Sequence, residues 1–410
     1  MNSSVSFQSV SSHGRMQLLD VLRGFASFGI LLVNIHSFSD VGWLTPEQKS
    51  SMATYPVDNV VKTILDIFID TKFITLFTIL FGVGFAIQLE RAKAAGINFK
   101  AYFAKRMAIL LTIACLHAYL LWFGDIIRYY AIAGFFLLLI MNWSVKAILR
   151  IAVFFAVFVT ASVFILNSII GIHYHANYPA LQQIHDAFAY GSYSEVLKIN
   201  WLIDPVHNFF QDSLITTAAV FGRVLLGYWL GRIYFFQKPK TFLNMRAKWI
   251  WWGLCLGFPC SVAFWAIKAG HLSLDSYWLL WLPYVIVCGL ILQSLFYIAI
   301  VMKLFEKKKW KKRLLPFGWV GRMALSNYLL QSVFGIIIFY GWFPGLRLKG
   351  IGATYLLVIS VFVFILQVLI SRWWLQHHSM GPVEWLWKKL AYPKKSLVKK
   401  FHPPQIVETI

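Results

Sequence analysis

The chain has 410 residues, of which 59% are hydrophobic and 13% charged, and its formal net charge is +22 at pH 7. Apolar stretches of about twenty residues recur along it, the length that crosses a bilayer as a helix. This composition indicates a polytopic membrane protein and excludes a soluble enzyme. The positive charge does not indicate a nucleic-acid partner, because no soluble part of the chain interleaves basic with aromatic residues.

Three parts follow each other along the chain. We expect a disordered polar N-terminus over residues 1–14, a transmembrane helical domain over 15–376, and a cytoplasmic interfacial helix with a basic tail over 377–410. The first apolar stretch lacks a small-residue cleavage site, so we interpret it as a retained helix and not a signal peptide. The four cysteines lack the paired spacing of metal ligands, and we predict free thiols and no metal site.

The first predicted span, near residues 17–37, contains a carboxylate, a guanidinium and a carboxamide between Asp20 and Asn34. An Arg or Asp at the centre of a spanning helix costs about 2.5–3.5 kcal/mol, so each such residue is a functional-site hypothesis. Asp20 and Arg23 lie three residues apart and share one helix face. They could instead be a cap that sets topology at the cytoplasmic end of the helix.

Hydropathy predicts about ten spans along the chain. They lie near residues 17–37, 73–90, 106–124, 126–143, 147–170, 208–232, 249–268, 277–302, 318–342 and 353–373. Lys and Arg gather in the loops after spans two, four, six and eight and in the C-terminal tail, which predicts that both termini are cytoplasmic. Attraction of these loops to an anionic leaflet explains the net charge. The fold class is therefore an all-α integral membrane bundle.

Two further segments are predicted to be interfacial helices. Asp58, Lys62, Asp66 and Asp70 recur every fourth residue between apolar side chains, which is the pattern of an amphipathic helix, here on the outer surface. Residues 381–390 begin Gly-Pro and mix Trp with Lys, as expected of a helix on the cytoplasmic face. The outer segment 171–207 contains several His and Asp residues without a metal-ligand spacing, and we interpret it as a solvated loop.

Two histidines could act as a general base. His117 lies within span three and His36 at the outer end of span one. A neutral imidazole whose tautomer is held by a carboxylate can accept a proton near physiological pH. Asp125 is eight residues from His117, so it could orient that ring only across a helix pair. The alternatives are an interhelical hydrogen bond for His117 and a plain interfacial position for His36.

Span nine and span six add polar groups. Arg322 lies near the cytoplasmic end and, with Asp20 and Arg23, could form a cationic mouth for a phosphate-bearing donor. Asn327 and Gln331 share a face of the same helix. Arg223 is a third buried cation, although the neighbouring glycines could simply accommodate a helix crossing. We take as candidate substrate-binding residues Asn34, Asn327, Gln331 and Arg223.

Several dispersed motifs resemble the YeiB family of bacterial inner-membrane proteins. They are Leu-Asp-Val-Leu-Arg-Gly at 19–24, Gly-Ile-Leu-Leu-Val-Asn-Ile at 29–35, Phe-Ile-Thr-Leu-Phe-Thr-Ile-Leu-Phe-Gly-Val-Gly at 73–84, Leu-His at 116–117, Gly-Asp-Ile at 124–126, Val-Gly-Arg-Met-Ala-Leu-Ser-Asn-Tyr-Leu-Leu-Gln at 320–331 and Gly-Pro-Val-Glu-Trp-Leu-Trp at 381–387. The first helix of that family is similar to those of the acyltransferase type three proteins and of heparan-glucosaminide N-acetyltransferase.

The resemblance implies transfer of an acyl group from cytoplasmic acyl-coenzyme A to an acceptor on the far side of the membrane. In the type three proteins a catalytic histidine stands where this chain has Asn34. The heparan-glucosaminide enzyme also has asparagine there, and its essential histidine lies further downstream. The resemblance therefore favours His117 as the acceptor-activating base, with Asp125 as its partner and His36 as the rival base.

The leading hypothesis is thus a transmembrane acyltransferase of the bacterial inner membrane. It would use acyl-coenzyme A as a co-substrate, hold no permanently bound cofactor, and acylate a hydroxyl or amine of a small molecule or glycan. The alternatives are a small-solute or lipid transporter with a midplane site near Arg223, and a non-catalytic scaffold. Besides the lipid bilayer and these ligands, the sequence predicts no partner; it leaves the oligomeric state open, a homodimer included.

Overall fold

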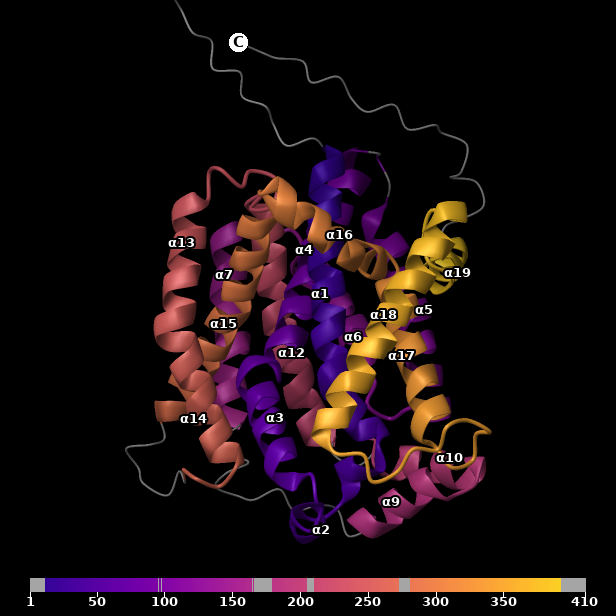
Figure 1. The fold of residues 1–410 in the computed structure, drawn as a ribbon. Helices are drawn as coiled ribbons and strands as arrows, with labels where there is room; N and C mark the ends of the chain where they lie inside the picture. The colour runs from indigo at the N-terminus through magenta and orange to yellow at the C-terminus, as the bar shows by residue number, and fades with distance from the viewer. Residues whose placement is uncertain are drawn as a thin grey trace, which may run out of the picture.

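The computed structural model describes residues 12–94, 96, 98–163, 165, 179–204, 210–272 and 281–391. Within these ranges the chain forms helices packed side by side in a bundle, and no strand (Figure 1). The all-α prediction is confirmed.

The helices have the following bounds. They are α1 (Ser12–Phe38), the short turn η1 (Asp40–Trp43), α2 (Pro46–Ser50), α3 (Tyr55–Phe68), α4 (Lys72–Ala94), α5 (Phe99–Leu120), α6 (Ile127–Ile140), α7 (Val145–Val153) continued by the π-helical segment η2 (Phe154–Val159), α9 (Leu181–Ala189), α10 (Tyr193–Leu202), α12 (Phe210–Arg232), α13 (Leu243–Trp252), the π-helical segment η3 (Gly253–Gly257), α14 (Phe258–Lys268), α15 (Leu282–Phe305), α16 (Lys308–Arg322), α17 (Ala324–Phe339), α18 (Ala353–His377) and α19 (Pro382–Ala391).

Seven helical segments of the described chain are long and apolar enough to cross a membrane. They are Gln17–Phe38, Tyr55–Ala94, Phe99–Leu120, Val145–Val163, Leu243–Lys268, Leu282–Phe305 and Ala353–His377. An eighth arises if the bent pair α16 and α17 is counted as one span. Predicted spans four and six correspond to the short apolar helix α6, with 14 residues, and to α12, with 23 residues. The chain is a polytopic membrane protein.

Predicted span nine differs from the structure. Instead of one helix over 318–342, α16 ends at Arg322 and α17 starts at Ala324, with an angle of 82° between them. Met323 at the bend has φ −115° and ψ 36°, outside the helical range. As a result α16 lies across one end of the bundle while α17 enters it (Figure 1).

α16 reaches this position because α1 and α16 cross in backbone contact. A Cβ atom added to Gly321 would lie 1.8 Å from the Asp20 carbonyl oxygen, and one added to Gly24 would lie 1.8 Å from the Phe317 carbonyl oxygen. Small residues permit such close approach between helices in a membrane. The crossing places the Asp20–Arg23 pair beside Arg322.

The predicted amphipathic helix before span two exists as α3, but its polar face points inward. Asp58 and Asp66 are buried, whereas Val57, Val60 and Ile64 are exposed. The carboxylates have protein partners: Asp58 accepts the N–H of Thr354 at 2.8 Å, and Asp66 pairs with Lys62 and Lys268. The amphipathic pattern is confirmed as a helix, but its acidic side chains bind other parts of the bundle while its apolar side chains are exposed.

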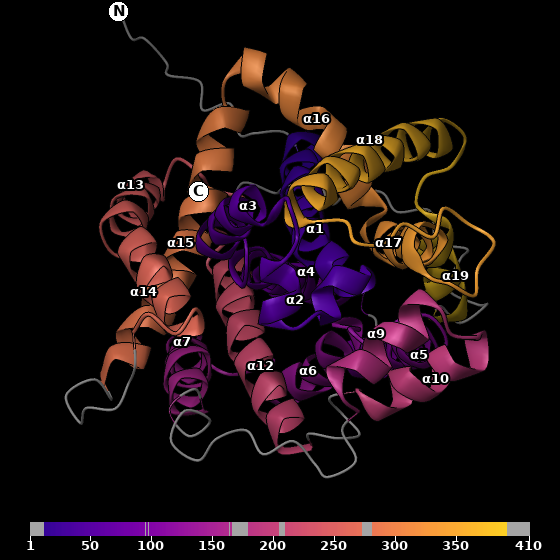
Figure 2. The ribbon, with the colours of Figure 1, turned by 60° about the horizontal axis from the view of Figure 1, so that its bottom comes forward.

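The two ends of the bundle carry different elements. α16 and α19 lie at one end, whereas α2, α9 and α10 lie at the other, which Figure 2 brings forward. We call the first the basic end, because it carries the lysines of α16 and α19. The predicted cytoplasmic helix forms as α19, beginning at Pro382 as expected. Of the long outer segment, α9 and α10 are helical; His173, His175 and His207 lie outside the described residues.

The crossing of α1 and α16 yields a matched pair of variants. Gly321→Ala forces a Cβ against backbone, and overpacking of this kind costs about 1–3 kcal/mol. Gly318→Ala, one turn earlier on α16, would bring its Cβ only to within 3.3 Å of the Val21 side chain. We expect a lower apparent melting temperature for Gly321→Ala and a value near wild type for Gly318→Ala, measured in detergent by fluorescence-detected size exclusion. Equal values would contradict the close crossing.

Candidate functional site

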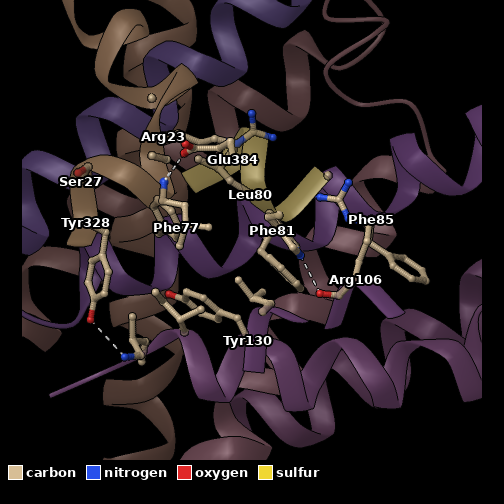
Figure 3. A pocket seen from close by; sticks show the side chains of 18 of the residues that line it. Arg23, Ser27, Phe77, Leu80, Phe81, Phe85, Arg106, Tyr130, Tyr328 and Glu384 are labelled. Atoms are coloured by element: carbon tan, nitrogen blue, oxygen red, sulfur yellow. Dashed lines mark hydrogen bonds between the residues drawn. The ribbon is translucent and has the colours of Figure 1, made fainter. Parts of the chain in front are cut away.

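A cavity of about 270 Å³ lies among α1, α4, α5, α6, α17, α19 and the end of α16. Its lining is polar toward the basic end, where Arg23, Arg106, Arg322 and Glu384 contribute. Two tyrosines, Tyr130 and Tyr328, line its inner part (Figure 3). Aromatic and aliphatic side chains form the walls between these ends; they include Phe77, Leu80, Phe81, Phe85, Phe103, Met107 and Leu110. The cavity therefore joins a cationic mouth to an apolar interior.

The guanidinium groups at the mouth differ in whether a carboxylate neutralises them. Arg23 Nη1 lies 3.0 Å from Asp20 Oδ1 and forms the predicted pair. Arg106 stacks over the Trp387 ring at 4.0 Å and donates from Nη1 to the Tyr102 hydroxyl at 2.8 Å. Neither Arg106 nor Arg322 has a carboxylate oxygen within 4.0 Å in the described part of the chain. Their positive charge is available to an anionic ligand.

α19 forms one wall of the mouth and is held there by Glu384. Its Oε1 accepts the N–H groups of Leu325 at 2.7 Å and Ser326 at 3.1 Å, and the Ser326 hydroxyl donates to Oε2. The carboxylate thus caps the first turn of α17, whose N–H groups have no partner within the helix. Burial raises the pKa of the Glu384 carboxyl above its usual range. Glu384 therefore joins the motif at 381–387 to the motif at 320–331, which contains the bend.

His117 is buried inside the bundle with both ring nitrogens hydrogen-bonded. Its Nδ1 lies 2.7 Å from Asp125 Oδ2, and its Nε2 lies 2.7 Å from Ser332 Oγ. His117, Asp125 and Ser332 are 3%, 2% and 1% exposed. Because an ionised carboxylate only accepts, Nδ1 carries the proton that goes to Asp125, and Nε2 accepts from the Ser332 hydroxyl. This is the connectivity of a Ser-His-Asp triad.

Arg128 and its partners fix Asp125. Its Oδ1 accepts the backbone N–H of Arg128 at 2.8 Å, and Arg128 in turn donates two hydrogen bonds to Asp204, at 2.6 and 2.9 Å. The Tyr119 hydroxyl also donates to Asp204, at 3.1 Å. Arg128 Nε also lies 3.9 Å from Asp125 Oδ1, so Arg128 holds one oxygen of Asp125 while the other oxygen orients His117.

Tyr328 stands between the cavity and the triad. It lines the cavity, and its ring centroid lies 5.4 Å from that of His117. Its hydroxyl donates to the Gly124 carbonyl and accepts from the Ile126 N–H, both at 3.3 Å. Ser332 follows Tyr328 by four residues on α17, one turn further from the mouth. His117 and Ser332 therefore lie behind the inner wall of the cavity.

Asn327 and Gln331 do not line the cavity and instead join three helices. Asn327 donates to Ser371 Oγ at 2.9 Å, and Gln331 donates to Ser27 Oγ at 3.2 Å and to Gln367 Oε1 at 3.3 Å. The network links α17 to α1 and α18. The geometry gives both residues a structural position beside the site.

The remaining predicted site residues lie apart from the triad. His36 faces α3, and no described residue accepts or donates a hydrogen bond at its Nε2. Asn34 is half-buried on the outer half of α1. The Nε of Arg223 is buried without a hydrogen-bond partner among the described residues, and Arg223 is not part of the cavity lining. The structure thus brings His117 and Asp125 together and leaves His36 elsewhere.

Ser332 and Arg106 are site residues that the sequence did not single out. Ser332 is separated from His117 by 215 residues, and a serine in an apolar helix is too common to stand out. Arg106 lies at the start of an apolar run, among the basic residues that follow predicted span two, so it did not stand out from the topology signal. Within the described ranges, no three His, Cys, Asp or Glu side chains gather as a metal site would require.

Comparison with known proteins gives one family. Residues 230–394 match the family model described as "Protein of unknown function (DUF418)". Over 94% of this chain and 96% of the relative, the sequence is 32% identical to the "Uncharacterized protein YxaH" of Bacillus subtilis (strain 168). It is 27% identical to the "Uncharacterized protein YeiB" of Escherichia coli (strain K12), over 91% of this chain and 95% of the relative.

The Arg128–Asp204 pair should be a strong contributor to stability. Asp204→Asn removes the bidentate counter-charge of a buried guanidinium and leaves it only the longer 3.9 Å contact with Asp125; breaking a buried pair costs about 3–5 kcal/mol. The double variant Arg128→Gln/Asp204→Asn removes both charges, so we expect it to recover part of that loss. The measurement is the apparent melting temperature of each purified variant. If the loss in the double variant equals the sum of the losses in Arg128→Gln and Asp204→Asn measured alone, the two residues act independently.

Proposed function

This chain belongs to the DUF418 family, together with YxaH and YeiB, and we propose that it is a transmembrane acyltransferase. In this proposal acyl-coenzyme A binds from the basic end, and the acyl group passes to a hydroxyl or amine acceptor that arrives from the opposite end. The observation that carries the proposal is His117, buried and held at 2.7 Å on each side by Asp125 and Ser332 behind the inner wall of the cavity.

The donor half of the proposal rests on the cavity. Coenzyme A carries phosphates at one end and a thioester at the other, and the cavity has guanidinium groups at one end and apolar walls beyond them. Arg106 and Arg322 would bind the phosphates, with Arg23 beside them. The acyl chain would lie among the phenylalanines, with its carbonyl pointing toward Tyr328. The protein needs no bound cofactor for this chemistry.

The chemical half rests on His117. With Nδ1–H bonded to Asp125, the Nε2 lone pair can take the proton of a hydroxyl that attacks the thioester carbonyl. The same nitrogen then gives the proton to the departing thiolate. Desolvation inside the bundle strengthens the Asp125–His117 interaction as the imidazolium forms.

We further propose that the protein resides in the bacterial inner membrane with the basic end in the cytoplasm. The lysines of α16 and α19 share this end (Figure 1), and Lys and Arg concentrate on the cytoplasmic side of membrane proteins. Relatives from Bacillus and Escherichia support a bacterial plasma membrane. A helical bundle fits that membrane, because bacterial outer-membrane proteins span as β-barrels.

Substitutions of the two histidines separate the rival bases. His117→Gln should lower acyl transfer by about 10³-fold or more, because the base is lost while the side chain stays polar. Asp125→Asn should also lower it strongly, since the tautomer is no longer held. Release of free coenzyme A thiol by inverted membrane vesicles measures the reaction, with His377→Ala, exposed at the end of α18, as the control. Loss of activity in His36→Ala with retention in His117→Gln would move the base to His36.

Two arginines on one helix test the donor site. Arg322→Ala removes a guanidinium from the mouth of the cavity, and hydrogen bonds to charged groups are worth about 1.5–3 kcal/mol. We therefore expect the dissociation constant of coenzyme A to rise about tenfold or more. Arg313→Ala, on α16 but stacked against Trp310 outside the cavity, should leave it unchanged. Binding of radiolabelled coenzyme A to purified protein is the measurement, and equal affinities in the two variants would contradict the proposed mouth.

A further inference from the structure

We propose that Ser332 carries the acyl group as a covalent ester during transfer across the membrane. This inference rests on the proposed acyl transfer and adds a nucleophile to it. Donor and acceptor would then react one after the other with the same serine, and they would never have to occupy the site together.

The hydrogen bonds of His117 favour this order of events. Nε2 is the atom that must take a proton from the attacking hydroxyl, and in the structure it already accepts the Ser332 hydroxyl at 2.7 Å. An acceptor molecule would have to displace Ser332 before it could use the same base. Three separate segments converge on this proton path: α17 supplies Ser332, α5 supplies His117, and the turn before α6 supplies Asp125.

Helix packing alone could satisfy the Ser332 hydroxyl in another way. A serine within a membrane helix usually satisfies its hydroxyl with a carbonyl of the preceding turn, as Ser360 does with Leu356 at 2.8 Å. Ser332 instead bonds a ring nitrogen across the bundle. Activation of a serine needs a base within hydrogen-bond reach and a third group that orients the base, and both are present.

The donor would reach Ser332 by passing Tyr328. Ser332 lies one helical turn beyond Tyr328 on α17. The Tyr328 hydroxyl is held by two hydrogen bonds of 3.3 Å, both long for a hydroxyl group. Rotation of this one side chain would open the inner end of the cavity onto the triad. Tyr328 is then the gate between donor and nucleophile.

Trp122 supplies a donor for the charge that develops on the carbonyl oxygen. Its Nε1 is buried and has no hydrogen-bond acceptor among the described residues, and its ring centroid lies 6.5 Å from that of His117. An indole N–H can only donate. A buried N–H without an acceptor lowers the stability of the resting protein. The same N–H can stabilise the oxyanion that forms during the reaction.

The two half-reactions balance. Ser332 Oγ attacks the thioester carbonyl carbon and its proton moves to His117 Nε2; the C–S bond breaks, and the thiolate leaves with that proton as free coenzyme A. In the second half, an acceptor hydroxyl or amine attacks the ester and gives its proton to Nε2. The bond from the carbonyl to Oγ then breaks, and Ser332 recovers the proton.

Exchange without an acceptor tests the covalent step. Purified full-length protein receives octanoyl-coenzyme A, or acetyl-coenzyme A, with ¹⁴C-labelled free coenzyme A. If Ser332 holds the acyl group, the label enters the acyl-coenzyme A pool, and Ser332→Ala lowers that exchange about 10³-fold or more. Ser332→Cys should retain a nucleophile and show an acyl adduct by intact mass. Ser360→Ala, a buried serine on α18, is the matched control, and melting temperatures establish that each variant is folded.

Acyl transfer in inverted membrane vesicles, which supply native acceptors, separates the two levels of the proposal. If wild type consumes acyl-coenzyme A but shows no exchange, and Ser332→Ala still transfers, the covalent step is overturned and direct transfer stands. If wild type neither consumes acyl-coenzyme A nor exchanges label, the acyltransferase proposal itself is overturned. Loss of exchange and of transfer together in a folded Ser332→Ala variant supports the covalent step.

Discussion

The hydrogen bonds of His117 to Asp125 and Ser332 organise the centre of this protein. A histidine buried in an apolar bundle loses free energy for each ring nitrogen that lacks a hydrogen-bond partner, and His117 has partners for both. Each partner is itself fixed: Asp125 by the Arg128 backbone and the Arg128–Asp204 pair, Ser332 by its place on α17. The direction of α17 follows from the bend at Met323, and Glu384 of α19 caps its first turn. The position of one imidazole therefore depends on contacts at both ends of the bundle.

The same arrangement divides the interior into two compartments. On one side of Tyr328 lies a cavity with a cationic mouth, and on the other lies the triad. In the proposed function, the phosphates of the donor meet the guanidinium groups at the mouth of the first compartment and its acyl group enters between the apolar walls. The proposed reaction needs only the acyl carbonyl to pass the tyrosine, while the charged part of the donor stays at the basic end. A transporter would instead need a continuous path for a whole solute, and Arg223, its predicted centre, lies outside the cavity lining.

Local pattern predicted much of the fold but only part of the site. Hydropathy located most of the long helices, although it predicted about ten spans where the described chain has seven or eight candidates, and it missed the bend between α16 and α17. The charges in the first apolar stretch correctly singled out the Asp20–Arg23 pair. His117 and Asp125 were also paired from the sequence, because the family resemblance favoured His117 and the spacing of eight residues allowed Asp125 to reach it across a helix pair. Ser332 could not be found in this way, since its partner is 215 residues away. Asn327 and Gln331 were predicted to bind substrate, but they join helices instead. Amide side chains within a membrane form hydrogen bonds between helices as readily as they bind substrates. The inward direction of the polar face of α3 could not be predicted locally, because its partners Thr354 and Lys268 lie on helices that are distant in sequence.

The most direct test of the account is a structure of the full chain determined with octanoyl-coenzyme A at saturating concentration. The account predicts density for the phosphates beside Arg106 and Arg322, the acyl chain among the phenylalanines of α4 and α5, and the thioester against Tyr328. Coenzyme A bound at the opposite end, or a cavity that stays empty at saturation, would contradict it.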